Sequence, residues 1–307
     1  MTDATSYVLI TPALNEAENL RRLAGCITAQ TLHPRSWIIV DNGSVDETPQ
    51  LLERLAERHA WIQVLTIPGQ HSAPRGAPIV RAFHAGLELV GEPVEVVVKL
   101  DADVSFEPGY FQRLLAAFAA DPGLGMASGT CWEQKDGQWR AEYSTKAHVR
   151  GAARAYRWEC LQQVLPLEER MGWDGIDEIK AAIRGWRTTS LGDLPFYHHR
   201  PMGEREGSRV RLWAGQGEMS YYMGYRPSYL IFRTLYRAPR DPAALAMLRG
   251  YAVAARRGER CPDPEVVRHL RAKQSLANLP RRAIDALGRT RSQDPARRVV
   301  VEQHGDR

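Results

Sequence analysis

The chain has 307 residues, of which 44% are hydrophobic and 25% are charged. This balance excludes a disordered or fibrous protein and is enough for a sizeable buried core. The net charge of +5 at pH 7 is too small to decide between nucleic acid, an anionic membrane and a phosphorylated ligand as the partner.

Targeting and cysteine patterns indicate a cytoplasmic protein. The first residues, MTDATSYVLITPALNE, contain no basic stretch followed by an apolar core, and no run of about 18 apolar residues occurs. The four cysteines include no CxxC pair, so we expect neither a zinc cluster nor a disulfide framework. The Arg- and Ala-rich composition is typical of a bacterial chain, with any contact to the inner membrane a peripheral one.

The first 120 residues alternate between apolar strands and amphipathic helices. The expected strands begin at Tyr7, Ser36, Trp61 and Val94, and the expected helices cover 18–30, 49–60, 75–90 and 109–120. This order predicts an α/β fold, Rossmann-like, with a mostly parallel sheet flanked by helices. Such sheets bind ligands at the carboxyl ends of their strands.

Polar residues follow three of these strands. They are Asn15–Glu16, Asp41–Ser44 and Asp101–Asp103. Alternation along an extended chain directs Asp101 and Asp103 to the same side, where two carboxylates suit one divalent cation. The alternative is that these acids merely cap the next helix or turn.

The segments TPALNEAENL, VDNGSVDET and KLDADVSFEPGYF, in this order, resemble the family 2 glycosyltransferases of the GT-A fold. GWDGIDEIKAAIRGWRT and HHRPMG extend the resemblance to residues 6–235. It implies a nucleotide-sugar donor and an inverting transfer. It also implies a nucleotide site formed by Pro12, Ala13, Asn15, Glu16, Asp41, Asn42, Gly43, Ser44, Asp101 and Ala102. Asp41 is the expected contact to the base. Helix capping by Asn15 and Glu16, and turn formation by Asp41–Ser44, remain alternative or additional roles.

Two arginines in the segment 71–86 are candidates for the diphosphate. The guanidinium groups of Arg75 and Arg81 offer paired donors to phosphate oxygens. This segment departs from the Asn/Gly/Lys-bearing loop that is common in the family. A solvated position on a helix face is the alternative for each arginine.

The resemblance also implies a metal ion and a catalytic carboxylate. We expect Asp103 to bind Mn²⁺ or Mg²⁺ directly, Asp101 to support it, and His198 or His199 to complete the site or touch the diphosphate. The general base is expected among the acids before the helix in GWDGIDEIKAAIRGW, where Asp177 is preferred over Glu178 and Asp174 is a third candidate. The alternative is that these acids only stabilise the helix N-terminus.

The chain changes character near residue 236. We expect a glycosyltransferase domain over 1–235, with a nucleotide-binding part at about 6–120 and an acceptor part at about 121–235. Residues 236–307 are expected to form basic amphipathic helices and a polar tail. These helices either contact an anionic membrane or pack on the catalytic domain with a solvated basic face.

Three function classes follow from these observations. The first is a metal-assisted glycosyltransferase, with a carbohydrate or lipid-linked acceptor and a place in cell-wall or polysaccharide biosynthesis. The second is a sugar nucleotidyltransferase, but TPALNEAEN lacks the Gly-rich triphosphate loop that such an enzyme needs after its first strand. The third is a non-enzymatic nucleotide- or nucleic-acid-binding module; for a glycosyltransferase we expect no nucleic-acid partner.

Overall fold

The computed structural model describes residues 6–69, 76–135, 137–142, 146–200 and 208–275. Its strands are β1 (Tyr7–Ala13), β2 (Ser36–Asp41), β3 (Ile62–Thr66), β4 (Val96–Leu100), β5 (Val104–Ser105), β6 (Leu124–Lys135), β7 (Gln138–Ala141), β8 (Ala153–Arg157) and β9 (Arg187–His198). The helices of the sheet domain are α1 (Ala17–Thr28), α2 (Thr48–Arg58), α3 (Ala77–Leu87), α4 (Tyr110–Ala120), α5 (Trp158–Val164) and α6 (Trp173–Ile183).

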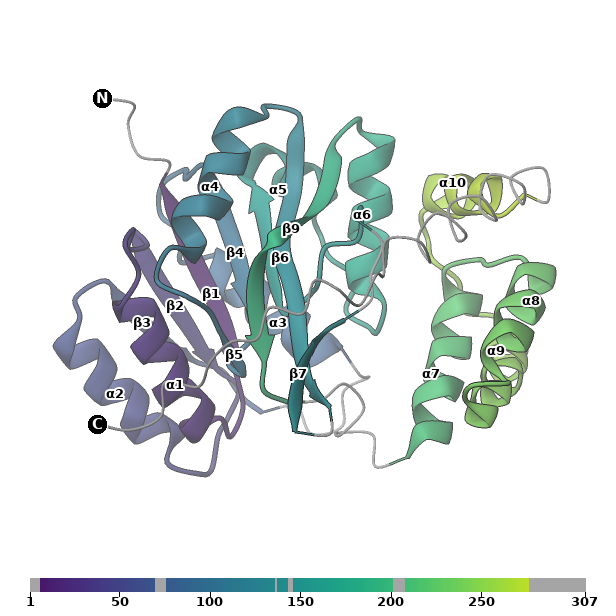
Figure 1. The fold of residues 1–307 in the computed structure, drawn as a ribbon, viewed down its shortest axis with the longest axis horizontal. Helices are drawn as coiled ribbons and strands as arrows, with labels where there is room; N and C mark the ends of the chain where they lie inside the picture. Colours follow the sequence, from purple (N-terminus) through teal and green to yellow (C-terminus); the bar gives the residue numbers. More distant parts are fainter. Residues whose placement is uncertain (1–5, 70–75, 136, 143–145, 201–207, 276–307) are drawn as a thin grey trace.

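Within the described residues, nine strands form one sheet in the order β3-β2-β1-β4-β8-β6-β9-β5, with β7 paired to β6 (Figure 1). The first four strands in this order are parallel. β8 is antiparallel to both β4 and β6, whereas β6 and β9 are parallel. The predicted parallel sheet is therefore confirmed for the N-terminal half, and the second half is mixed.

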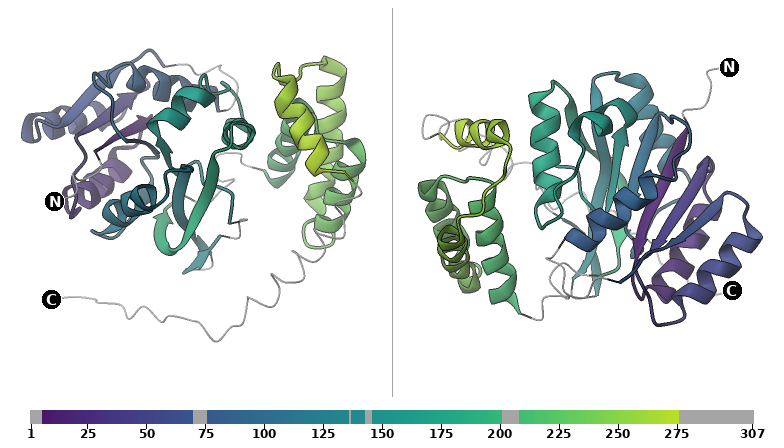
Figure 2. Two further views of the ribbon diagram at one scale, coloured as in Figure 1. Left: turned by 90° about the horizontal axis from the view of Figure 1, so that it is seen from above. Right: turned by 180° about the vertical axis from the view of Figure 1, so that it is seen from behind.

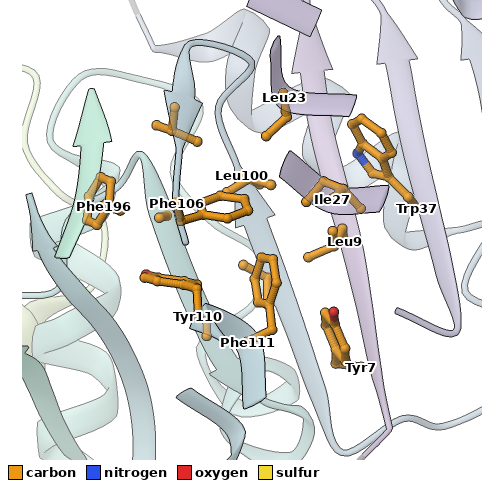
Figure 3. Close-up of a cluster of buried hydrophobic side chains, with 14 of the residues drawn as sticks. Tyr7, Leu9, Leu23, Ile27, Trp37, Leu100, Phe106, Tyr110, Phe111 and Phe196 are labelled. Atoms are coloured by element: carbon orange, nitrogen blue, oxygen red, sulfur yellow. The ribbon is translucent and has the colours of Figure 1, made fainter. Parts of the chain in front are cut away.

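The helices cover both faces of the sheet. Alternate residues of β1 point to opposite sides, so Tyr7 and Leu9 face α1, α2 and α4, while Val8 and Ile10 face α3, α5 and α6. Figure 3 shows the first of these two cores, where Tyr7 stacks on Phe111 with ring centroids 5.1 Å apart. The result is the three-layered α/β architecture that the strand-helix alternation predicted.

A second group of helices follows the sheet domain. It consists of α7 (Arg209–Tyr222), α8 (Pro227–Arg237), η2 (Pro242–Leu245), α9 (Ala246–Arg257) and α10 (Pro264–Lys273). Figures 1 and 2 show this group to one side of the sheet domain. The domain boundary expected after residue 235 lies inside α8, and the change from sheet to helices comes at α7. The expected polar tail lies outside the described residues.

The helical group is attached to the sheet domain through α6. Ile176 and Ile179 of α6 pack with Tyr222 of α7 and with Val266 and Leu270 of α10. Inside the group, α7 and α9 approach closely at Gly217 of α7 and Gly250 of α9. A Cβ atom on Gly217 would lie 2.0 Å from the carbonyl oxygen of Met247. No helix in the described part of the chain is long and apolar enough to cross a membrane.

Candidate active site

The loops after β1 and β2 hold each other at the carboxyl edge of the sheet. Asn15 has a left-handed backbone (φ 54°), its N–H donates to Ser44 Oγ at 2.8 Å, and its Oδ1 accepts from Val45 N at 2.9 Å. Ser44 N in turn donates to Asp41 Oδ1 at 3.0 Å. These residues therefore have a structural function at the site that the sequence assigned to the nucleoside.

Gly43 is required by the same pair of loops. Its φ of 78° favours glycine, and a Cβ atom there would lie 2.7 Å from the backbone nitrogen of Gly69. Pro12 and Ala13 end β1 in register with Val40 and Asp41 of β2. The structure thus brings together all the residues predicted from the first two loops.

Asp101 and Asp103 follow β4 and do not cap a helix. The next helix, α4, begins at Tyr110 with Gly109 as its N-cap residue. The carboxylate of Asp101 pairs with Lys99, whose Nζ also donates to the carbonyl oxygen of Gly151 at 2.9 Å. Ala102, between the two acids, is buried. The two aspartates therefore do not cap the next helix, although residues 102–103 do form a turn.

Asp103 lies among three charged side chains, from β6, from the end of β9 and from the segment just after it. His198 Nε2 is 3.3 Å from Asp103 Oδ1, and His198 Nδ1 is 3.5 Å from Glu133 Oε1. Arg200 approaches Asp103 Oδ2 at 3.5 Å and donates to Glu16 Oε2 at 2.6 Å. This cluster, Asp103, Glu133, His198 and Arg200, connects the ends of β1, β4, β6 and β9.

Electrostatics within the cluster favour charged side chains. Burial alone would lower the pKa of His198, but its pairing with the carboxylates of Asp103 and Glu133 outweighs burial and raises the pKa to about 9. Burial would raise the pKa of Asp103, yet His198 and Arg200 lower it below its ordinary value. Burial raises the pKa of Asp101, against the opposing effect of Lys99.

The donor set fits a divalent cation. Asp103 Oδ1 and Glu133 Oε1 are buried and make no hydrogen bond within the described part of the chain. Cys131, Glu133 and His198 place potential ligand atoms within 4.8 Å of one another. Carboxylate oxygens together with an imidazole suit Mn²⁺ better than Mg²⁺.

The structure separates the two neighbouring histidines. His199 turns away from the carboxylates: its Nε2 lies 2.7 Å from Ser105 Oγ and its ring packs against Trp139. Only its backbone N–H contacts Asp103, at the carbonyl oxygen. Of the two, His198 is the one whose side chain meets the acids.

The two arginines expected at the diphosphate are not brought to this cluster by any described contact. Arg75 lies outside the described residues. Arg81, on α3, pairs with Glu169 in the segment before α6. Its side chain is partly exposed.

The acids of α6 occupy three different environments. Asp177 is buried: Arg154 donates to its Oδ1 and Tyr156 OH donates to its Oδ2, each at 2.6 Å. Burial raises the pKa of Asp177 to about 7, in spite of Arg154. Glu178 Oε1 accepts from Val149 N at 2.7 Å and from Arg154 at 2.9 Å.

Asp174 lies in the first turn of α6 and is partly exposed, as Glu178 is. A Cβ atom on Gly151 would lie 3.3 Å from Asp174 Oδ2, so Asp174 borders the same backbone that Lys99 and Asp101 contact. Trp173, its neighbour, has Lys99 Nζ 5.4 Å from its ring centroid. Asp174 therefore combines access to solvent with proximity to the DAD segment, whereas Glu178 Oε1 is bonded to Val149 N and Arg154.

Sequence reasoning missed Glu133, Lys99 and Arg154. Glu133 lies on a strand whose polar and apolar residues gave no motif. Lys99 is the charged residue of the otherwise apolar β4, Arg154 lies between two alanines of β8, and both are almost completely buried. Such a buried cation needs an anionic partner, and this is the signal that would have pointed to Asp101 and Asp177.

The fold and the site define a class of protein, the GT-A glycosyltransferases. The structure of a mannosyltransferase from Pyrobaculum calidifontis in complex with GDP-Man and Mn²⁺ matches with a TM-score of 0.53 and 20% identity, over 94% of this chain and 81% of that one. TarS 1-349 of S. aureus in complex with UDP-GlcNAc matches with a TM-score of 0.52 and 17% identity, over 70% and 66% of the two chains.

The glycosyl transferase family 2 model matches residues 8–168, and the chain belongs to this family. An uncharacterized glycosyltransferase of Mycobacterium tuberculosis is 29% identical over 226 residues, which are 68% of this chain and 90% of the relative. Glycosyltransferase AglE of Haloferax volcanii is 23% identical over 244 residues, 73% of this chain and 76% of the relative. The protein is thus a glycosyltransferase, and the nucleotidyltransferase and binding-module alternatives are set aside.

Proposed function

We propose that the protein transfers a sugar from a nucleotide-diphosphate-sugar donor to an acceptor hydroxyl of a carbohydrate or lipid-linked saccharide, with inversion at the anomeric carbon. The observation that carries the proposal is the position of Asp103 and His198 at the carboxyl edge of the parallel strands, where Arg200 joins Asp103 to Glu16 of the loop after β1. The neighbours that hold GDP-Man with Mn²⁺ and UDP-GlcNAc support a donor of this class.

The metal site of the proposal consists of Asp103, His198 and Glu133, with Asp101 in support. A bound Mn²⁺ or Mg²⁺ would neutralise the charge that develops on the leaving diphosphate. The protein's own contribution is to hold the acids in place: Lys99 fixes Asp101, and the short pairing of β5 with β9 fixes His198 opposite Val104, next to Asp103. Arg200 adds a guanidinium at the same edge, where it suits a phosphate oxygen.

Asp174 is the general base of the proposal, in place of the expected Asp177. A pKa near 7 would suit a base, but a base must first reach the proton that it removes. Both oxygens of the buried Asp177 are hydrogen-bonded to Arg154 and Tyr156. Asp177 and Glu178 then act as positioning residues that fix α6 to β8, and Asp174 meets the acceptor hydroxyl.

Calorimetric titration of the full chain tests this function. We expect one of UDP, GDP or dTDP, or a sugar derivative of it, to bind with Mn²⁺ and to lose its affinity in EDTA. Asp103→Ala should abolish the metal-dependent part of the nucleotide affinity, whereas His199→Gln should retain it. Binding that is equal with Mn²⁺ and EDTA, or equal in wild type and Asp103→Ala, would remove the metal from the proposal.

A further inference from the structure

Helix α8 carries a stripe of large apolar side chains that faces solvent. Ile231, Phe232, Leu235 and Tyr236 are 46%, 57%, 57% and 71% exposed. At 3.6 residues per turn they occupy one side of the helix, about 140° wide. The opposite side packs on α9 and η2 through Leu230, next to Ala244 and Met247. Single exposed apolar residues are ordinary, but four on one stripe indicate a binding surface.

The charge beside this stripe has one sign. Residues 226–240 contain four arginines, Arg226, Arg233, Arg237 and Arg240, and no acidic residue. Arg233 comes next around the helix from the stripe, whereas Arg237 lies close to the buried side, with its guanidinium carbon 5.2 Å from the ring centroid of Trp213. Arg240 lies over the ring of Tyr236, with its guanidinium carbon 5.3 Å from the ring centroid. The apolar stripe is thus bordered by cations.

We propose that this face of α8 binds the surface of an anionic lipid bilayer. Phe, Leu and Ile side chains would enter the boundary between headgroups and acyl chains, Tyr236 would lie at the headgroup level, and the arginines would pair with lipid phosphates. α8 has 11 residues, so it lies on the surface and does not span. Figure 1 shows α7 between α8 and the sheet domain.

A second copy of the chain fits this surface less well. In a two-fold contact the same patch meets itself, so the arginines of the two copies would face one another. The stripe also measures only about 9 Å along the helix, so it is small against the roughly 800 Å² per partner of a stable interface. An anionic bilayer satisfies both the apolar stripe and the arginines.

This inference deepens the proposed function, because a protein held on a bilayer reaches lipid-linked acceptors. It does not depend on that function for its test. Vesicle binding needs neither donor nor acceptor, so failure of this inference is separate from failure of the proposed transfer.

The test is flotation of the full chain with vesicles of phosphatidylcholine alone and with about one third phosphatidylglycerol. We expect binding to the anionic vesicles, weakened by salt. Phe232→Gln with Leu235→Gln should reduce the partition coefficient by at least about tenfold. Leu89→Gln, an exposed apolar position on the sheet domain, is the matched control and should bind as wild type does.

Three outcomes would overturn the inference. Equal binding of wild type and the α8 double variant would place the membrane contact elsewhere in the chain. Absence of binding to anionic vesicles would exclude it. A dimer in sedimentation velocity that the same two substitutions dissociate, without vesicle binding, would assign the face to a second copy. Circular dichroism of the double variant checks that the helices are retained.

Discussion

His198 lies with one ring nitrogen 3.3 Å from Asp103 and the other 3.5 Å from Glu133. The histidine is placed by the pairing of its strand, since β9 runs antiparallel to the two-residue β5 that follows the DAD segment. A single ring thus bridges carboxylates that are 30 residues apart in the sequence. This arrangement makes the two histidines of the HHR segment experimentally distinguishable.

We expect His198→Ala to weaken Mn²⁺ binding at least about tenfold, because a nitrogen ligand is lost from a site with few ligands. Glu133→Gln should weaken it in the same direction, by removing a negative charge. Mn²⁺ titration followed by electron paramagnetic resonance measures both. His199→Ala is the control, since its ring faces Ser105. A loss in the control as large as in His198→Ala would refute the assignment.

We expect Asp174→Asn to reduce sugar transfer by about 10²–10⁴-fold while donor affinity stays near the wild-type value. Single-turnover transfer and calorimetry with the donor supply the two measurements. Glu178→Gln serves as the comparison within the same helix. If Asp174→Asn transfers normally and Asp177→Asn or Glu178→Gln does not, the base is one of the acids that the sequence first indicated.

We expect Asp177→Leu to lower the free energy of unfolding by about 3–5 kcal/mol, because it leaves the guanidinium of Arg154 buried without its main partner. The double variant Arg154→Met, Asp177→Leu should regain part of this loss, since both buried charges are then gone. Urea denaturation at neutral pH compares the three proteins. Equal destabilisation of single and double variants would show that packing, and not charge, dominates at this position.

The hydrogen bond between His148 and Glu178 makes stability depend on pH. Burial alone would lower the pKa of His148, but Glu178 raises it above its ordinary value of 6.5. The folded chain therefore holds this proton more tightly than the unfolded chain does. The stabilisation is fully present below about pH 6.5 and is lost as the pH rises through the raised pKa.

Unfolding free energies of wild type and His148→Gln between about pH 5.5 and pH 8.5 measure this dependence. The difference between the two proteins should be largest at the acidic end and should shrink as the pH rises. A difference that stays constant across the range would mean that His148 acts by packing alone.

We expect a Gly→Ala substitution to have opposite effects on stability at two helix glycines, Gly250 and Gly25. A Cβ atom on Gly250 would lie 1.9 Å from the carbonyl oxygen of Ala214, so Gly250→Ala must push α9 from α7 and lower the melting temperature. Gly25, in α1, has no atom within 4 Å of such a Cβ, so Gly25→Ala should stabilise the protein by about 0.5–1 kcal/mol. Thermal unfolding separates the two; a stabilised Gly250→Ala would contradict the close helix contact.

The N-terminal half of the fold was predictable because its signals are local. Each strand from Tyr7 to Leu100 is a short apolar run, and each is followed by a helix with a regular apolar face. The loop residues Asn15, Asp41 and Asp103 follow those strands directly. Parallel strands place such loops at one edge, so the sequence order alone predicts the site.

The second half depends on contacts between distant segments. β6 pairs with β8 and β9, which lie on either side of α6 in the sequence, and this topology brings Glu133 to His198. Nothing near Glu133 in the sequence marks it as a site residue. The sequence also could not distinguish Asp174 from Asp177 as the candidate base, because the difference depends on the hydrogen bond that Arg154 of β8 donates to Asp177. In both cases tertiary pairing, and not local pattern, decides the environment of an acid.

The order of the sheet has a consequence for the behaviour of the protein in concentrated solution. A strand at the edge of a sheet presents unpaired backbone groups, and a long, flat edge strand invites pairing with another molecule. Here one edge ends in β5, which has only two residues. It pairs with only two of the twelve residues of β9, so β9 itself forms most of this edge. Pro195 in β9 and the register shift between Gly129 and Thr130 in the adjoining β6 interrupt the ladder there, which opposes pairing of this edge with another molecule.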